Sequence, residues 1–303
     1  MVSATMRKKP LKTRYNTYRM LTLTSAFCLI LAVPFLNKHF HFSFIQGWFQ
    51  SLSIGHLWFV SPLEGLESIL TSRKLYAPLL VGMLGPILLA MLLGRVFCSW
   101  ICPVSFFSEV LDRIIRLVTR KRFRRQSRPL PRRTLWFALL GEIILTLIMG
   151  APIFVFLSPP GLIGREIMMA TLFHTLAIEG IMVVAVLLFH LASRRLFCRY
   201  LCPLGALIGI LAVKRRLVVK MDRESCIDCG FCKRTCPLGL DPAKGDTFSA
   251  YCWNCGECVD ACKTGALDFS WKAPGNPGAL PDSTVRSSSA TGPEAGEKTR
   301  DEK

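Results

Sequence analysis

Long apolar runs alternate with polar, mostly basic segments along this chain of 303 residues. Two charge-free runs cover residues 20–36 and 75–94, and two further apolar runs, each containing one glutamate, cover residues 134–157 and 171–192. About 20 apolar residues are enough for a helix to cross the hydrocarbon core of a bilayer. The pattern therefore predicts an α-helical membrane protein with four transmembrane helices, within a membrane domain of residues 20–216.

Basic residues are concentrated in some of the segments that separate these runs. Residues 1–19 and 95–133 are rich in Lys and Arg, whereas residues 158–170 contain only Arg165, and the net charge of the chain is +18. Because cytoplasmic loops carry the excess of Lys and Arg, we expect both termini and residues 95–133 on the cytoplasmic side of a bacterial inner membrane. The charge lies beside apolar runs and on no recognition module, which disfavours nucleic acid as the partner.

Eight of the 13 cysteines form two matching runs near the C-terminus. The runs read C-I-D-C-G-F-C-K-R-T-C-P and C-W-N-C-G-E-C-V-D-A-C-K. This is the spacing of bacterial ferredoxins, in which the fourth cysteine of each run binds the other cluster. The spacing predicts a 4Fe–4S cluster on Cys226, Cys229, Cys232 and Cys262. It predicts a second 4Fe–4S cluster on Cys252, Cys255, Cys258 and Cys236.

Residues 217–270 are therefore predicted to form a small α+β, two-cluster ferredoxin domain. Structural zinc and a disulfide framework are the alternatives, and disulfides are disfavoured if this segment is cytosolic. Residues 271–303 are rich in Gly, Pro, Ser and alternating charges, a composition typical of a disordered tail.

The predicted membrane domain contains an internal repeat. Residues 95–103 (RVFCSWICP) parallel residues 195–203 (RLFCRYLCP), and residues 59–62 (FVSP) parallel residues 156–159 (FLSP). The four spans then form two tandem two-helix repeats, related by an axis along the membrane normal. Such an axis would bring together at the cytoplasmic face Cys98, Cys102, Cys198 and Cys202.

We interpret these four cysteines as a further metal or cluster site, with reduced cysteines or two redox-active pairs as the alternatives. Pro103 suits the first position of a helix, and the residues after it predict an amphipathic interfacial helix with Glu109 and Asp112 on its polar face. Nearby arginines and helix N-termini should favour the thiolate forms of Cys102 and Cys202.

These motifs together make the chain resemble the NapH/MauN family over roughly residues 15–270. These are polytopic quinol-dehydrogenase subunits of periplasmic nitrate reductase and methylamine-utilisation systems. The resemblance implies a subunit that oxidises quinol from the membrane pool. It would pass electrons through a periplasmic ferredoxin-like subunit or a multihaem cytochrome to a periplasmic redox enzyme. Two other functions remain open, namely a copper or other metal-ion reductase or assembly factor, and a membrane redox-sensing regulator.

Two acidic residues lie near the middle of predicted spans, where ionisable groups are costly and usually functional. We interpret Glu142 and Glu179 as a proton relay or quinol-binding pair, with protonated, hydrogen-bonded structural residues as the alternative. Five further residues of the predicted outer face could each accept a quinol proton, although a solvated loop or interfacial position is the favoured interpretation for each one singly: His56, Glu64, Glu67, Glu166 and His174.

Overall fold

The computed structural model describes residues 15–40, 45–47, 49–55, 57–119, 130–154, 158–175 and 180–271. Most of the basic N-terminal segment, the tail after Trp271, His56 and Glu179 lie outside the described residues. The roles predicted for His56 and Glu179, and the disorder predicted for the tail, therefore stay predictions.

The first half of the predicted membrane domain begins with a long helix and continues into a small sheet. Helix α1 covers Tyr15–Phe40, and strands β1 (Ile45–Gly47), β2 (Ser51–Ile54) and β3 (Leu57–Val60) form an antiparallel sheet in the order β1-β2-β3. Helix α2 (Pro62–Ser72) follows, and α3 (Ala77–Leu93) packs against β3. The sheet and α2 lie in the segment that separates the first two apolar runs.

The second half repeats the order of the first, with a long helix, a helix that starts at a Ser-Pro pair, a second long helix and a short helix at a Cys-x-x-x-Cys-Pro motif. After α4 (Val96–Trp100) and α5 (Pro103–Thr119) come α6 (Thr134–Met149), α8 (Pro159–Met168) and the π-helical turn η1 (Met169–Phe173). The half ends with α9 (Gly180–Ala192), α10 (Leu196–Tyr200), α11 (Pro203–Leu211) and the short 3₁₀ turn η2 (Ala212–Lys214). Both α2 and α8 begin at a Ser-Pro pair, with Ser61 and Ser158 as the residues before the first turn.

Two predicted helix boundaries are wrong. The third apolar run does not form one helix to residue 157, because α6 ends at Gly150, which adopts a left-handed conformation at φ 65°. The segment after Ser158 is not a loop, since α8 starts there with Pro159 at its first position.

Within the described residues, one helix, Tyr15–Leu36, is long and apolar enough to cross a membrane by length and composition alone. Shorter apolar helices cover Ala77–Leu93, Thr134–Met149, Gly180–Leu191 and Pro203–Lys214. The four predicted spans therefore stay a prediction.

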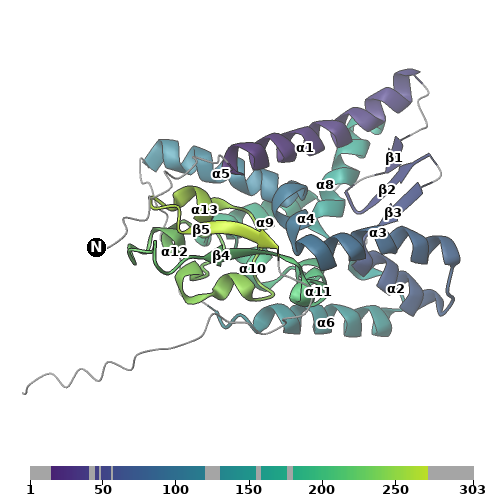
Figure 1. Cartoon of the computed structure of the whole chain (residues 1–303). Helices are drawn as coiled ribbons and strands as arrows, with labels where there is room; N and C mark the ends of the chain where they lie inside the picture. The colour runs from purple at the N-terminus through teal and green to yellow at the C-terminus, as the bar shows by residue number, and fades with distance from the viewer. Residues whose placement is uncertain are drawn as a thin grey trace, which may run out of the picture. The chain divides into compact units, whose positions relative to one another are not determined.

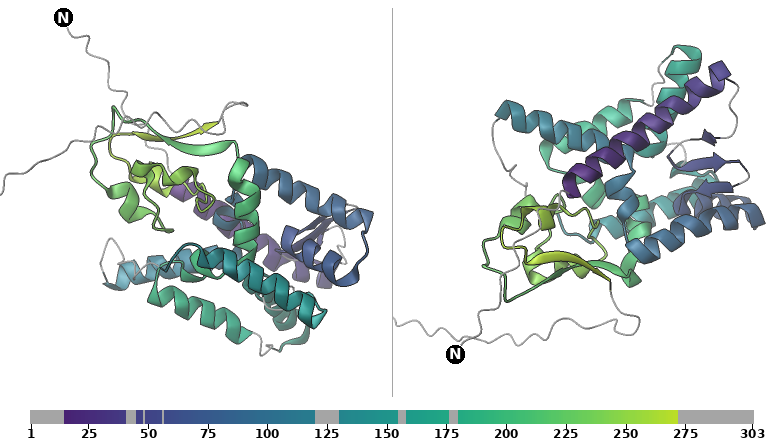
Figure 2. Two further views of the ribbon diagram at one scale, coloured as in Figure 1. Left: turned by 90° about the horizontal axis from the view of Figure 1, so that it is seen from below. Right: turned by 45° about the horizontal axis from the view of Figure 1, so that its top comes forward.

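The C-terminal module folds as a small α+β unit. Strand β4 (Leu217–Met221) pairs antiparallel with β5 (Leu267–Trp271), and between them lie α12 (Phe231–Thr235), η3 (Pro242–Lys244), η4 (Asp246–Phe248) and α13 (Glu257–Ala261). Figures 1 and 2 show this module beside α1 and α5, away from β1–β3. Its residues Leu238, Leu240 and Trp253 share one hydrophobic core with Leu135 of α6 and Ala206 of α11. The module is therefore built into the helical part by continuous packing.

Candidate iron–sulfur centre

One predicted ligand set lines a cavity in the C-terminal module. The walls of this cavity include Leu238, Leu240 and Trp253. The same walls carry Cys236, Cys252, Cys255 and Cys258. All four cysteines are buried, and the thiol of Cys258 interacts electrostatically with the other three. The structure thus brings the fourth cysteine of the first run beside the first three of the second, which is the crossed arrangement.

The other predicted set lies nearer the surface. Cys229 is exposed, while Cys226, Cys232 and Cys262 are half-buried. Helix α12, which contains Cys232, packs against α13, which ends just before Cys262. Gly230 and Gly256 precede these two helices at φ 67° and 78°, a conformation that glycine adopts at little cost. These positions let the backbone turn sharply between the cysteines of each run.

The chemistry of the cavity fits an iron–sulfur cluster. Burial raises the pKa of Cys236 to about 11 and the pKa of Cys255 further, so thiolates there require positive charge beside them. The iron of a bound 4Fe–4S cluster would supply that charge, since such a cluster is held by four cysteine thiolates. The spread of these cysteines around a cavity therefore suits a cluster.

The structure also brings together Cys98, Cys102, Cys198 and Cys202. Cys102 interacts electrostatically with the other three, and Cys202 interacts with Cys98 and Cys198. The two motifs that supply them have the same local structure. In each motif the second cysteine donates its backbone N–H to the carbonyl five residues earlier, over 3.0 Å to Phe97 and 3.0 Å to Phe197.

Hydrogen-bond donors and cations surround this four-cysteine set. The guanidinium groups of Arg95 and Arg195 lie over the ring of Trp253, with centroid distances of 5.8 and 5.9 Å. Both arginines are buried, and they interact electrostatically with Cys98 and Cys198 respectively. Trp253 Nε1 is buried and has no hydrogen-bond partner among the described residues. Such surroundings suit a group with net negative charge.

The predicted preference for thiolates at this set is wrong for the cysteines taken alone. Burial raises the pKa of Cys198 to about 11 and those of Cys102 and Cys202 further, and the cations and backbone N–H groups do not offset it. The prediction considered the helix N-termini and arginines and omitted the desolvation of the thiols.

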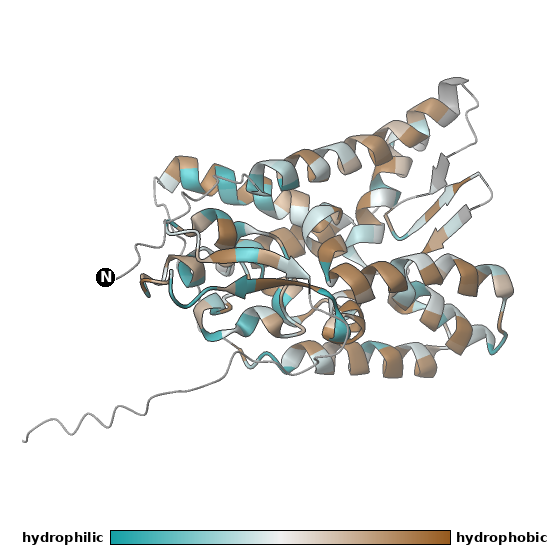
Figure 3. Cartoon of the chain, viewed as in Figure 1, coloured by the Kyte–Doolittle hydropathy of each residue, from teal (hydrophilic) through white to brown (hydrophobic). Residues whose placement is uncertain are grey.

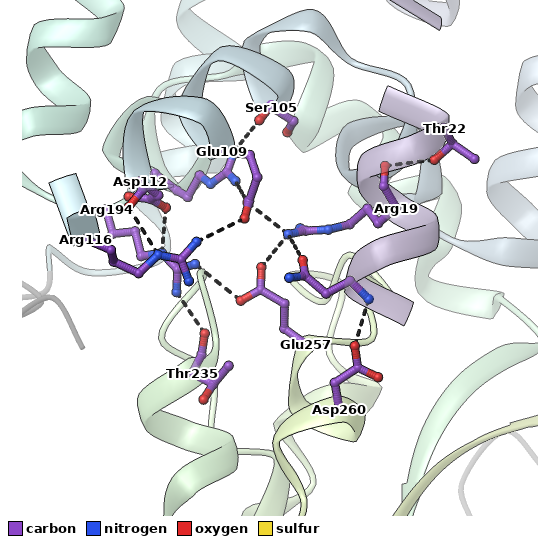
Figure 4. A network of polar contacts seen from close by, with 12 residues as sticks. Arg19, Thr22, Ser105, Glu109, Asp112, Arg116, Arg194, Thr235, Glu257 and Asp260 are labelled. Atoms are coloured by element: carbon purple, nitrogen blue, oxygen red, sulfur yellow. Dashed lines mark hydrogen bonds and ion pairs between the residues drawn. The ribbon is translucent and has the colours of Figure 1, made fainter. Parts of the chain in front are cut away.

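A buried network of ion pairs joins the helical part to the module (Figure 4). Arg19 of α1 donates to Glu109 of α5 at 2.8 Å and to Glu257 of α13 at 2.7 Å. Arg195 contacts the same Glu109 oxygen at 2.7 Å, and Arg194 contacts Glu257 at 3.2 Å. Arginines from two regions thus hold together the carboxylates of α5 and α13.

Asp112 extends this network toward α9. Arg195 N donates to His190 Nδ1 at 3.3 Å, so Nδ1 carries no proton and Nε2–H donates to Asp112 Oδ1 at 2.9 Å. Arg194 Nε donates to the other carboxylate oxygen at 2.9 Å. Burial alone would raise the pKa of Asp112, but the His190 hydrogen bond and the charge of Arg194 hold it well below its usual range.

The network corrects the predicted orientation of α5. The helix is amphipathic, but Glu109 and Asp112 point into the protein, with 1% and 4% of their surface exposed, while Ile114, Leu117 and Val118 are exposed. These buried pairs could not be predicted from the sequence, because their partners lie 63 to 90 positions away in the chain or, for Arg19 and Glu257, 238 positions away.

Glu142 lies on α6, and the structure places another acidic side chain beside it. Glu67 of α2 is fully buried and interacts with both Glu142 and Thr146 of α6. The predicted partner of Glu142, Glu179, lies outside the described residues, and His174 is exposed. Glu67 is therefore the described acidic neighbour of Glu142, although the sequence singled it out only as one of five residues of the outer face.

Two family models of 4Fe-4S domains match the regions that contain these cysteines. A family model described as a 4Fe-4S binding domain matches residues 77–125 and 174–220, and one described as a 4Fe-4S dicluster domain matches residues 212–273. The first model covers both Cys-x-x-x-Cys-Pro motifs and the second covers the ferredoxin-type runs. The fold and these matches define an iron–sulfur electron-transfer protein of ferredoxin type.

Curated relatives identify the family. The chain is 31% identical to the methylamine utilization ferredoxin-type protein MauN of Methylorubrum extorquens, over 78% of this chain and 80% of that protein. It is 26% identical to the ferredoxin-type protein NapH of Haemophilus influenzae, over 85% of this chain and 90% of that protein. The chain belongs to the NapH/MauN family of ferredoxin-type proteins.

A third relative matches this chain over only part of its own length. The putative electron transport protein YccM of Escherichia coli is 31% identical over 76% of this chain, which spans 64% of YccM. No solved structure matches the chain.

Proposed function

We propose that this chain is a membrane-bound subunit that oxidises quinol and passes electrons, through a ferredoxin-like partner, to a periplasmic redox enzyme. The observation that carries the proposal is the cavity lined by four buried cysteines, which shares a core with helices whose outer faces are apolar. A protein with these two features can hold redox groups beside a lipid phase, where quinol is dissolved.

The apolar outer faces support a position in the bilayer. Several helices of the described part expose large hydrophobic side chains, and Figure 3 shows α3 and α6 largely in the colour of hydrophobic residues. Phe137 and Ile148 of α6 are 68% and 75% exposed, and Val81 of α3 and Ile181 of α9 are 64% and 66% exposed. Soluble proteins rarely expose contiguous apolar surfaces of this kind. Lipid covering these faces would remove their contact with water.

Two 4Fe–4S clusters are the proposed cofactors of the C-terminal module. A bound cluster takes up and releases one electron at a time. The ligands proposed for the buried cluster are Cys236, Cys252, Cys255 and Cys258. Those proposed for the outer cluster are Cys226, Cys229, Cys232 and Cys262. With basic segments inside, the module lies on the cytoplasmic side in this proposal.

A further redox or metal group is proposed at Cys98, Cys102, Cys198 and Cys202. The support is the burial of the four thiols, the flanking Arg95 and Arg195, and the unpartnered indole N–H of Trp253. The test uses protein in which all four cysteines are replaced by serine. Loss of iron and sulfide supports a cluster. Loss of copper alone supports the metal-ion reductase, and unchanged metal content contradicts the site.

The experiment for the main proposal is quinol-driven reduction of the intact protein in lipid nanodiscs, followed by EPR spectroscopy. A menaquinol or ubiquinol analogue should produce the reduced-cluster signal at a rate that supports turnover. Dithionite serves as the control for the total amount of reducible cluster. A full dithionite signal with no reduction by either quinol would contradict quinol oxidation and favour the redox-sensing regulator.

A further inference from the structure

Buried polar side chains without hydrogen-bond partners gather where α2 meets α6. Glu67 of α2 is fully buried, and its Oε2 accepts the backbone N–H of Phe154 at 3.1 Å. Its Oε1, Oε1 of Glu142 and Oγ1 of Thr146 are buried atoms of the described part that make no hydrogen bond of regular geometry, although Glu67 lies within reach of both other side chains. These three side chains lie together, since Glu67 interacts with Glu142 and with Thr146.

Unpartnered buried polar atoms are uncommon in native proteins, and each calls for an explanation. Here two of the three are carboxyl oxygens from different helices. Two carboxylates in contact within a buried site cannot both be ionised, so such a pair retains a proton and can exchange it. Thr146 adds a hydroxyl that can both donate to and accept from either carboxyl group.

A third acidic side chain lies beside the pair and is partly exposed. Glu64 lies one helical turn before Glu67 on the same side of α2, and it interacts electrostatically with Glu67. It is half-buried, with a buried Oε2 that has no described partner. Helix α2 begins at Ser61, on the side of the chain that the distribution of basic residues predicts to face outward. Glu64 therefore extends the acidic pair by one turn along α2, as its partly exposed member.

We propose that Glu67 and Glu142 form a proton-accepting pair for quinol oxidation, and that Glu64 passes the protons to the outer solvent. The inference rests on the proposed function. Oxidation of quinol to quinone releases two electrons and two protons. The electrons leave singly to the one-electron carriers that the cysteines hold. The pair, already holding one proton, accepts one more from a quinol hydroxyl group and transfers it through Glu64 before the second arrives.

The test compares Glu67→Gln and Glu142→Gln with the matched surface variant Glu224→Gln, in the full chain in nanodiscs. Each variant keeps the shape of the side chain and removes its ability to hold an exchangeable proton. We expect quinol-driven cluster reduction to be at least about tenfold slower in the first two variants and unchanged in the third, because general acid–base groups contribute on the order of 10² to rate. Reduction by dithionite should be equal in all three.

Redox-induced infrared difference spectra supply a readout that does not depend on turnover. The wild-type protein should show a protonated-carboxyl band that shifts in D₂O, and this band should be absent in Glu67→Gln and retained in Glu224→Gln. If Glu67→Gln does not fold, Glu67→Asp takes its place and should retain the band at a shifted frequency. The inference is overturned if the band persists in both Gln variants or if both are reduced by quinol at the wild-type rate.

The outcomes also separate this inference from the proposed function. A wild-type protein that dithionite reduces and quinol does not would overturn both. Fast reduction of wild type and of both Gln variants by quinol would leave quinol oxidation standing and remove the proton-accepting pair alone.

Discussion

Replacing Arg19 by methionine should destabilise the contact between α1, α5 and the C-terminal module. Arg19 is fully buried and contacts two carboxylates, Glu109 at 2.8 Å and Glu257 at 2.7 Å. A hydrogen bond to a charged group contributes about 1.5–3 kcal/mol to stability. Glu109 keeps the buried Arg195 and Glu257 keeps the half-buried Arg194, so neither carboxylate is left unpaired, and the loss of the two hydrogen bonds should cost about 3–5 kcal/mol.

The chain contains a matched control for this prediction. Arg116 contacts the same Glu109 at 3.6 Å, but 44% of its side chain is exposed. Solvent screens that pair, so Arg116→Met should cost at most about 1 kcal/mol.

Thermal unfolding of the protein in detergent, followed by tryptophan fluorescence, measures both effects. A loss of 1 kcal/mol lowers the Tm of a domain of this size by about 2–4 °C, which gives a decrease of roughly 6–20 °C for Arg19→Met. Equal, small decreases for both variants would refute the account of the network.

Three further predictions concern the same elements. Asp260→Ala removes the carboxylate that accepts two backbone N–H groups at the start of α1 and should cost about 0.5–2 kcal/mol by the same thermal assay. The pKa of Asp112 is lowered in the folded state, so its stabilising effect is complete above its unfolded pKa of about 3.9 and is lost as the pH falls below that value. The difference in Tm between wild type and Asp112→Asn should therefore be constant from about pH 5 to pH 7 and shrink in more acidic buffer. Cys236→Ser and Cys252→Ser should abolish the EPR signal of the same cluster, whereas Cys229→Ser should abolish the signal of the other cluster. If Cys236→Ser instead abolishes the same signal as Cys229→Ser, the crossed arrangement is contradicted.

The cysteine arrangement could be read from the sequence because ligand spacing is local. The two runs and the two Cys-x-x-x-Cys-Pro motifs each lie within a dozen residues, and their repetition indicated which cysteines meet. In the structure Cys236 lines one cavity with three cysteines of the second run, and the paired motifs lie together. Which cysteines bind a cluster stays a prediction.

The ion-pair network and the acidic pair could not be read in the same way. The polar face of α5 has the sequence pattern of a face exposed to solvent. Only the fold shows that Glu109 on this face is buried and accepts hydrogen bonds from Arg19 and Arg195. Glu67 has the surroundings of an outer loop in the sequence, and its burial follows from the packing of α2 on α6. The end of α6 at Gly150 depends on a left-handed backbone that the apolar run around it concealed.

Iron and acid-labile sulfide analysis of the anaerobically purified chain, combined with EPR after reduction, tests the central claim most directly. Two clusters of four irons each predict at least about eight irons per chain and reduced 4Fe–4S signals. A protein that contains zinc in place of iron, or that stays colourless after anaerobic reconstitution with iron and sulfide, would contradict it.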